Sequence, residues 1–432
     1  MSNEIGTTMY SWICDLFPIC RSLTGDGNRE TLDYLNKILN GQLNVYEVPT
    51  GYQAFDWTVP KEWKIRNAWI KNESGEKIVD FAVNNLHLVG YSTPVDTKIT
   101  LEELQQHLYS LPDQPNAIPY ITSYYKERWG FCVTENFRQT LTDGKYHCFI
   151  DSELFDGSLT YADLIIQGKT EEEIFLSTYF CHPSMANNEL PGPAVTTALI
   201  QWLMEEKRRY TYRIIFVPET IGSLIYLSKN LEIMKQRTKA GFVITCVGDN
   251  RTYSLLRSRL GNTLADKAAL AILKEYNNKD NETTWTEYSF LSRGSDERQY
   301  GAPGIDLPVV SLMRTKYGEF PEYHTSLDNL ELVTEEGLLG AYNVIKKTIT
   351  ALEKNQTYQV QCLGEPQLGK RGLYPTISTK KSGHEVRDMM NFIAYCDGKH
   401  DMFDIQDKIQ ISIDDLFSTA EKLEKTGLIK AI

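Results

Sequence analysis

Two histidines and two acidic residues stand where they could act together on a substrate. His182 follows the apolar stretch FLSTYFC and Glu219 follows IIFVP, while Asp296 lies in SRGSDERQY and His324 lies in PEYHTSLDN. Each position is at the end of a predicted strand or in the loop beyond it. Two imidazoles with two carboxylates are the ligands and the base that a hydrolytic zinc site needs. Together, although not singly, these residues indicate hydrolysis assisted by a metal ion.

The elements that must position these residues alternate between strands and helices. The apolar runs at 174–180, 212–217, 242–247 and 308–313 predict buried strands, and the segments between them are helical. This pattern is typical of a mainly parallel sheet, which binds its ligands outside the carboxyl ends of the strands. Apolar residues recur at helical spacing after Pro193. The stretch STYFCHPSMANNELPGP therefore predicts a strand, a loop and the start of a helix.

Changes in composition and in the pattern of predicted elements divide the chain into three domains. Residues 1–53 and 141–352 predict one α/β domain with three layers, α/β/α. Residues 54–140 are rich in aromatic residues and turn signals, and they predict an inserted β-rich domain. Residues 353–432 predict compact helices, then a turn and a short strand, which is typical of a winged helix.

Composition limits the class of protein and the cellular compartment in which this chemistry could occur. The 432 residues are 41% hydrophobic and 11% aromatic, which excludes a largely disordered chain. No apolar run of about 18 residues could span a bilayer, and the N-terminus lacks the basic start of a secretory signal. The eight cysteines form no CxxC pair. We therefore expect a protein of the cytoplasm, with no membrane partner.

Charge argues against nucleic acid as a partner. The net charge is −12, and residues 385–432 hold six Lys or Arg against ten Asp or Glu. A domain that reads DNA usually carries a basic face. We expect no nucleic acid partner, and instead a protein partner or self-association through the winged helix.

The motifs resemble those of the aminopeptidase-like zinc hydrolases, a phosphorylase/hydrolase-type fold that carries a site for two zinc ions. The similarity runs along nearly the whole chain, through RSLTGDGNRETL, CHPSMANNELPGP, VPETIGS, GSDERQY and EYHTSLDNL. It is closest to a bacterial branch of this family that has an inserted β domain and a C-terminal winged helix. The pattern of the wider family is a His, a bridging Asp four residues before a Gly, a Glu-Glu pair, an Asp and a final His.

Carried over residue by residue, the resemblance implies His182, Asp296 and His324 as zinc ligands and Glu219 as the general base. The implied reaction is metal-assisted hydrolysis of an amide bond in a small amino-acyl or peptide substrate. In it, Glu219 takes a proton from water and later passes it to the leaving amine. The chain has no GxSxG elbow, no GxxxxGK[ST] loop and no GxGxxG after a strand, which other reaction classes need.

Two positions depart from the family pattern. Asn188 falls on the bridging Asp and Thr220 on the second Glu, so two carboxylates are missing. Two dications close together need anionic ligands to offset their repulsion. We therefore expect one zinc ion rather than two, with Asn188 or water completing its shell. A shift of one residue in the loop, which would bring Glu189 to the metal, stays an alternative.

Three further residues are candidates for contact with the substrate. Tyr323, Arg298 and Arg314 could steady an oxyanion or a substrate carboxylate, and a structural ion pair is the alternative for each arginine. The two missing carboxylates also leave a second function open. In that alternative the chain is a non-catalytic relative with a degenerate metal site, which binds a small ligand or a protein.

Overall fold

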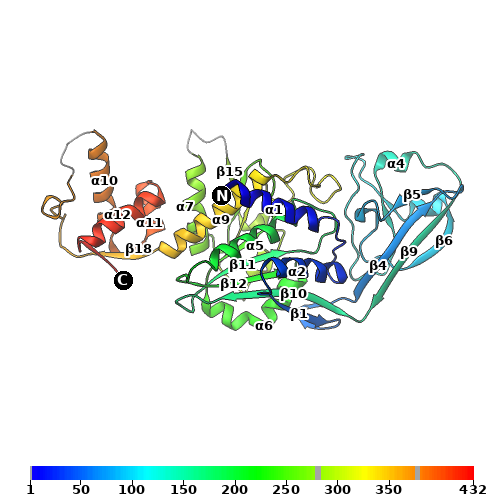
Figure 1. Cartoon of the computed structure of the whole chain (residues 1–432), viewed down its shortest axis with the longest axis horizontal. Coiled ribbons are helices and arrows are strands. Elements are labelled where there is room, and N and C mark those ends of the chain that lie inside the picture. Colours follow the sequence, from blue (N-terminus) through cyan, green and yellow to red (C-terminus); the bar gives the residue numbers. More distant parts are fainter. Residues whose placement is uncertain (1, 278–283, 375–379) are drawn as a thin grey trace. The chain divides into compact units, whose positions relative to one another are not determined.

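An eight-stranded mixed sheet lies at the centre of the fold (Figure 1). The computed structural model describes residues 2–277, 284–374 and 380–432. The strands lie in the order β1-β10-β12-β11-β13-β16-β14-β15. In chain order their bounds are Asn44–Pro49 (β1), Ser158–Ile166 (β10), Glu173–Tyr179 (β11), Thr211–Val217 (β12), Thr238–Ile244 (β13), Tyr253–Leu256 (β14), Trp285–Tyr288 (β15) and Val309–Met313 (β16).

The four predicted strands form the parallel middle of this sheet. Strand β11 pairs in parallel with β12 on one side and with β13 on the other, and β13 pairs in parallel with β16. Every residue of β11 and of β12 is buried, as expected for central strands that helices cover on both faces. The parallel arrangement predicted for these four strands is confirmed, but the sheet as a whole is mixed, because β1 with β10, β10 with β12 and β14 with β16 pair antiparallel.

Helices on both faces complete three layers (Figure 1). Helix α5 packs on β11 and β13 with α1 and α2 beside it, and α6 lies on the opposite face. Helix α5 follows β11 and α6 follows β12; these right-handed crossovers run in opposite directions along the sheet, so their helices fall on opposite faces. The bounds are Ser2–Leu16 (α1), Asp26–Ile38 (α2), Pro191–Leu203 (α5), Ile221–Arg237 (α6), Glu297–Tyr300 (α8) and Glu335–Lys354 (α9).

Between β1 and β10 the chain builds a second, antiparallel sheet in the order β5-β4-β9-β6. This part is β-rich, as the sequence predicted, but it extends beyond the predicted limit at residue 140, because β9 lies entirely after that residue. Its core is continuous with that of the central sheet, since Trp63 and Ile150 belong to the same buried cluster as Phe175. The bounds are Gln53–Ala54 (β2), Trp57–Thr58 (β3), Glu62–Lys71 (β4), Lys77–Asp80 (β5), Val95–Thr100 (β6), Leu101–Gln105 (α3), Leu108–Tyr109 (β7), Phe131–Cys132 (β8), Glu135–Gln139 (α4) and Lys145–Phe155 (β9).

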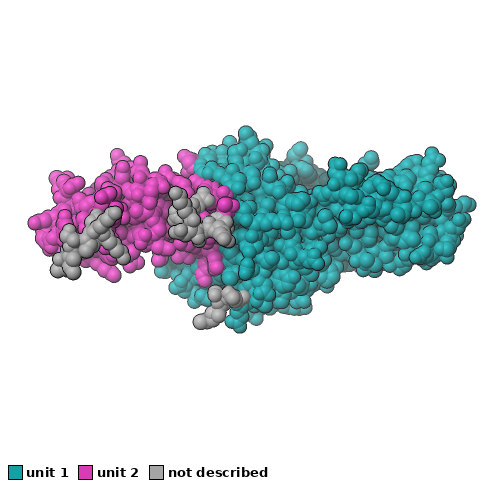
Figure 2. Space-filling model, turned by 90° about the horizontal axis from the view of Figure 1, so that it is seen from above, with its two compact units in different colours: residues 1–261, 286–342 teal, residues 262–285, 343–432 magenta. Residues whose placement is uncertain are grey.

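Figure 2 colours the two compact units into which the chain divides, residues 1–261 with 286–342 and residues 262–285 with 343–432. The second unit contains α7 and the C-terminal winged helix, whose short sheet has the order β18-β17-β19. Its bounds are Leu264–Leu273 (α7), Thr357–Val360 (β17), Lys380–Ala394 (α10), Asp397–Asp401 (β18), Met402–Ile409 (α11), Ile413–Lys425 (α12) and Ile429–Ala431 (β19). Across the described residues, no helix is both long and apolar enough to cross a membrane.

Candidate functional site

His182 and Glu219 meet at the carboxyl end of the central sheet. His182 follows β11 and Glu219 follows β12, and the helices after these two neighbouring strands diverge to opposite faces. Such a divergence is where open α/β sheets bind their ligands. Nε2 of His182 lies 3.8 Å from Oε2 of Glu219. The structure therefore brings these two predicted residues together.

His324 joins them from the loop after β16. Its ring centroid lies 5.4 Å from that of His182, and the ring of Tyr323 stacks on it at 3.9 Å. Tyr120, from the inserted segment, lies 5.2 Å from the ring of His182 and 5.3 Å from that of His324. Its backbone N–H donates to the carbonyl oxygen of His324 at 2.9 Å. Sequence analysis missed Tyr120, because it belongs to a part of the chain that was assigned to a separate domain.

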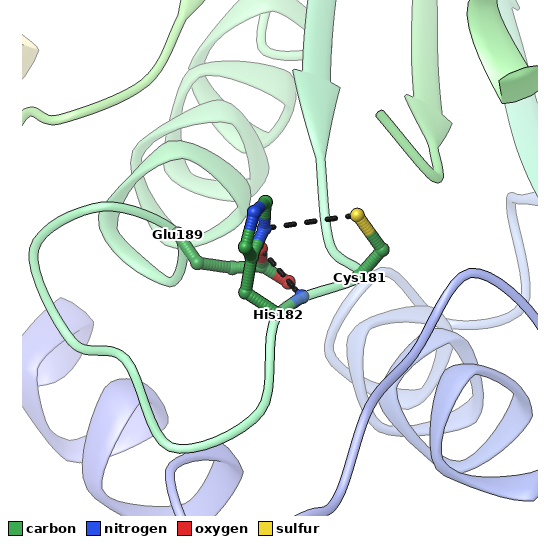
Figure 3. Close-up of side chains that lie close together, drawn as sticks. All are labelled: Cys181, His182 and Glu189. Carbon is green, nitrogen blue, oxygen red and sulfur yellow. Dashed lines mark hydrogen bonds and ion pairs between the residues drawn. The ribbon is translucent and has the colours of Figure 1, made fainter. Parts of the chain in front are cut away.

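The other side of His182 is held by Glu189 (Figure 3). Oε2 of Glu189 lies 2.5 Å from Nδ1 of the ring, and both carboxylate oxygens accept from the backbone N–H of His182 at 2.8 Å. This leaves Nε2 to face Glu219. A carboxylate on one ring nitrogen is the usual support of a histidine that binds a metal through the other. Glu189 thus lies against the ring nitrogen that faces away from Glu219.

Arg21 anchors this carboxylate in turn. Its Nε lies 3.4 Å from Oε1 of Glu189 and donates to the carbonyl oxygen of His182 at 3.1 Å. The side chains of Arg21 and Glu189 have no exposed surface. Arg21 begins the motif RSLTGDGNRETL, for which the sequence suggested no role. It reaches His182 from 161 positions earlier in the chain, a distance over which no local pattern could reveal it.

Asn188 lies in a buried loop that hydrogen bonds hold from two sides. The hydroxyl of Tyr179 donates to its Oδ1 at 3.3 Å. Its backbone N–H donates to Asp328 at 2.9 Å, and that of Asn187 donates to the same carboxylate at 2.5 Å. Asp328 follows His324 in EYHTSLDNL, so one segment supplies both a site residue and the support of this loop.

Asp296 and Arg298 both contact the turn that carries Glu219. Thr220 has φ +66°, a conformation that a β-branched residue rarely adopts. Asp296 accepts from its backbone N–H at 2.7 Å, and Arg298 donates to its hydroxyl at 2.7 Å. Ser295 donates to Oε1 of Glu219 at 2.7 Å. This loop therefore both holds the strained turn and orients the carboxylate of Glu219.

Backbone strain gathers at this edge of the sheet. Nine residues other than glycine have positive φ among those described, and four of them are here: Ser184, Thr220, Cys246 and His324. Such conformations cost about 1–3 kcal/mol each, and they persist where the surrounding structure holds them, most often at functional sites. This concentration supports the assignment of a functional site to the ends of β11, β12, β13 and β16.

Arg314 does not join this group. Its guanidinium donates to the carbonyl oxygen of Asp249 and to the side chain of Asn250, each at 2.8 Å, and it lies 4.0 Å from the ring centroid of Tyr253. Its exposed fraction is 2%. These contacts give Arg314 a structural role, although through neutral partners and not through the ion pair that was the alternative to substrate binding, so we leave it out of the proposed site.

Burial and neighbouring charges shift the pKa values of these groups. Burial and the nearby His182 lower the pKa of His324 to about 3, so its ring is neutral at neutral pH. Burial raises the pKa of Asp296, and the adjacent Glu219 raises it further. Burial also raises the pKa of Glu219, against the opposing effects of His182 and Ser295. Against the effect of burial, Cys181 and Glu189 raise the pKa of His182 well above its ordinary value, so a metal ion at Nε2 would have to displace a proton from this ring.

The candidate ligand atoms are of the types that bind zinc. His182 presents Nε2, His324 has a neutral ring, and Oδ2 of Asp296 is buried without a hydrogen-bond partner in the described part of the chain. Imidazole nitrogens and carboxylate oxygens are typical zinc ligands. These three side chains do not form a group whose candidate ligand atoms all lie within 4.8 Å of one another.

One such group does occur among the described residues, and it consists of Cys181, His182 and Glu189 (Figure 3). Sγ of Cys181 lies 3.7 Å from Nδ1 of His182, and the same ring nitrogen is bonded to Glu189. The guanidinium of Arg21 lies next to that carboxylate and would compete with a cation for it. We therefore interpret this group as the support of His182 rather than as the metal centre itself.

Comparison with known proteins agrees with this architecture. A family model described as "Domain of unknown function (DUF4910)" matches residues 10–355, and a winged helix-turn-helix model matches residues 356–431. The chain is 43% identical to the "Putative polysaccharide biosynthesis protein with aminopeptidase-like domain" of Clostridium acetobutylicum, over 100% of this chain and 98% of that protein.

Solved structures show the same fold. The crystal structure of a "putative peptidase" from Clostridium acetobutylicum matches with a TM-score of 0.92 and 42% identity, over 100% of this chain and 97% of the other. A zinc aminopeptidase from Bacillus subtilis matches with a TM-score of 0.57 at 11% identity, over 80% of this chain and 95% of the other. The expected aminopeptidase-like fold and winged helix are thereby confirmed. The chain belongs to the DUF4910 family and combines its aminopeptidase-like α/β domain with a C-terminal winged helix.

Proposed function

We propose that this protein is a zinc-dependent hydrolase that cleaves an amide bond of a small amino-acyl or peptide substrate. The observation that carries the proposal is the pairing of Nε2 of His182 with Glu219, while Glu189 holds the opposite ring nitrogen. His182 and His324 would hold the ion, with Asp296 and Asn188 as further oxygen donors. When bound there, zinc would supply a Lewis acid for the scissile carbonyl and for water.

Glu219 is the residue best placed to move protons. About 22% of its side chain is exposed, against 5% for His182, so a substrate can reach it. Ser295 occupies one carboxylate oxygen and leaves the other toward His182. In this role Glu219 takes a proton from the attacking water and later donates it to the leaving amine. Arg298 and Tyr323, which border Glu219 and His324, would steady the developing negative charge.

A second function remains a candidate on a specific observation. Asn188 and Thr220 occupy positions where the wider family has carboxylates, and the side chains of His182, Asp296 and His324 are not gathered as one tight set. Such a site suits a non-catalytic protein that binds a small ligand or a protein partner.

The two functions predict different results for metal removal. Protein purified without chelator should contain about one zinc ion per chain, because neutral Asn188 cannot bridge two dications. It should release amine from one or more members of a panel of aminoacyl amides and dipeptides. Dipicolinate should abolish this activity and added zinc should restore it. No bound metal, no zinc uptake on titration and no hydrolysis would favour the binding protein.

We also propose that the winged helix does not bind DNA, although many domains of this fold do. The exposed side chains of α12 include four acidic and two basic ones: Asp414, Asp415, Glu421, Glu424, Lys422 and Lys425. A duplex DNA probe at about 50 mM salt should therefore show no change in fluorescence anisotropy. The triple variant Asp414→Lys, Asp415→Lys and Glu421→Lys should bind the DNA probe weakly, and added salt should abolish this binding. Salt-sensitive DNA binding by the unmodified protein would contradict this proposal. The absence of DNA binding would favour a protein partner or self-association through the winged helix.

The expected cellular location also stays a proposal. All eight cysteines are free thiols, which supports a reducing compartment such as the cytoplasm.

A further inference from the structure

A pocket next to His324 is walled by the inserted segment. It has a volume of about 410 Å³, within the range of about 300–1,000 Å³ that is usual for small-molecule sites. Most of its lining is apolar or aromatic and includes Leu108, Tyr109, Leu111, Pro119, Ile121 and Tyr323. Tyr120 also lines it, and the ring of this residue lies 5.2 Å from His182 and 5.3 Å from His324. The pocket therefore borders the candidate site directly.

One charged side chain lines this pocket. Arg138 is the only Lys, Arg, Asp or Glu among the described residues that form its wall. Its Nε donates to Oε1 of Gln105, Nη1 donates to Ser110 and Nη2 donates to the carbonyl oxygen of Gln105. A guanidinium has five N–H donors, so each terminal nitrogen keeps one N–H without a partner. Within the described residues, no carboxylate forms a direct ion pair with Arg138; Glu135 is linked to it through Ser110, which donates to Oε2 of Glu135 at 2.6 Å.

These features select a ligand with an apolar body and an anionic end. The two terminal nitrogens of a guanidinium match the two oxygens of a carboxylate, which gives short and strong paired hydrogen bonds. The walls favour a large apolar or aromatic side chain, which gains free energy as it leaves water. In a small peptide both features occur together in the C-terminal residue.

We propose that this pocket binds the C-terminal apolar residue of the substrate, with Arg138 donating hydrogen bonds to its free carboxylate. The proposal rests on the proposed function and makes it more specific: the substrate is a dipeptide or similarly small peptide, and the residue in the pocket leaves as the amine. The inserted domain then selects the substrate, while the central sheet supplies the hydrolytic residues.

Binding tests this assignment without any hydrolysis. L-Phenylalanine and L-phenylalaninol share the apolar side chain and the amine, but the alcohol has no carboxylate and neither contains an amide bond. Calorimetry should show that L-phenylalanine binds and that Arg138→Met weakens it by about 10- to 100-fold, the effect of losing hydrogen bonds to a charged group. Arg66→Met is the matched control, because Arg66 lies in the inserted sheet and pairs with exposed Asp151 and Glu153. Equal binding of the acid and the alcohol, or no effect of Arg138→Met, would overturn the assignment.

A second pair of variants guards against a loss of fold at Arg138. Leu111→Glu and Leu111→Gln introduce side chains of similar size at the wall, and they differ in charge alone. Leu111→Glu should weaken L-phenylalanine more than Leu111→Gln does, because the new carboxylate repels that of the ligand. The two variants should bind L-phenylalaninol alike. The same affinity of both variants for L-phenylalanine would count against a carboxylate in this pocket.

Hydrolysis separates failure of the pocket from failure of the function. Alanyl-phenylalanine should release alanine faster than alanyl-phenylalaninol, and Arg138→Met should remove the difference. Equal rates for the two substrates with no effect of Arg138→Met would refute the assignment of the pocket but would still support the proposed hydrolase activity. L-Phenylalanine binding that depends on Arg138 in a protein that hydrolyses neither compound would uphold the pocket and refute the hydrolase.

Discussion

Replacing Glu219 by glutamine should lower the rate of amide hydrolysis by about 10²- to 10⁴-fold while the zinc content of the protein stays unchanged. The magnitude is that of a lost general base. Glutamine keeps the shape and can still accept the hydrogen bond from Ser295, but it cannot take up a proton. The retained metal follows from the proposal that the ion is held by His182 and His324 and not by Glu219. Initial rates and elemental analysis on the same samples measure both quantities.

Two variants give this result its meaning. His324→Ala should lose zinc and activity together, because it removes a proposed ligand. Glu232→Gln is the matched control, since Glu232 is an exposed carboxylate on α6, the helix that follows Glu219, and it should change neither quantity. If Glu219→Gln loses zinc as completely as His324→Ala does, Glu219 is a ligand and its role as the base is refuted.

Replacing Glu189 by glutamine should weaken zinc binding by about 10- to 100-fold, the usual effect of losing the carboxylate that supports a metal-binding histidine. In the structure this carboxylate lies 2.5 Å from Nδ1 of His182 and fixes which ring nitrogen faces the site. A neutral amide at this position makes the imidazole a weaker metal ligand than the carboxylate does. Competition with a chromophoric chelator measures the affinity.

The same change should also destabilise the fold, and a double variant separates the two effects. Glutamine at position 189 leaves the buried guanidinium of Arg21 without its ion-pair partner, which costs about 3–5 kcal/mol. Combining Glu189→Gln with Arg21→Met removes both charges, so the free energy of unfolding in urea should largely recover. Zinc affinity should stay low in the double variant. Recovery of zinc affinity along with stability would mean that the pair matters for the fold alone.

The sequence by itself predicted the frame of the site. The apolar runs that became β11 and β12 are fully buried strands, and such runs are a local signal because a central parallel strand meets helices on both faces. The polar residue after each run, His182 or Glu219, therefore had to fall at the same edge of the sheet. The inserted β-rich segment and the winged helix were likewise visible as changes of local texture.

Which side chains complete the site was decided by the tertiary structure. Arg21 reaches Glu189 from the segment between α1 and α2, Tyr120 arrives from the inserted segment, and Arg314 turns to Asp249 instead of a substrate. Hydrophobic periodicity indicates which face of a helix or strand is buried against the neighbouring layer. It carries no record of hydrogen bonds between residues more than a hundred positions apart, because these depend on how the layers and the insertion come together. The sequence thus determined the strand ends that carry His182 and Glu219, and the tertiary structure, in which the distant Arg21 holds Glu189 against Nδ1, decided which ring nitrogen of His182 faces Glu219.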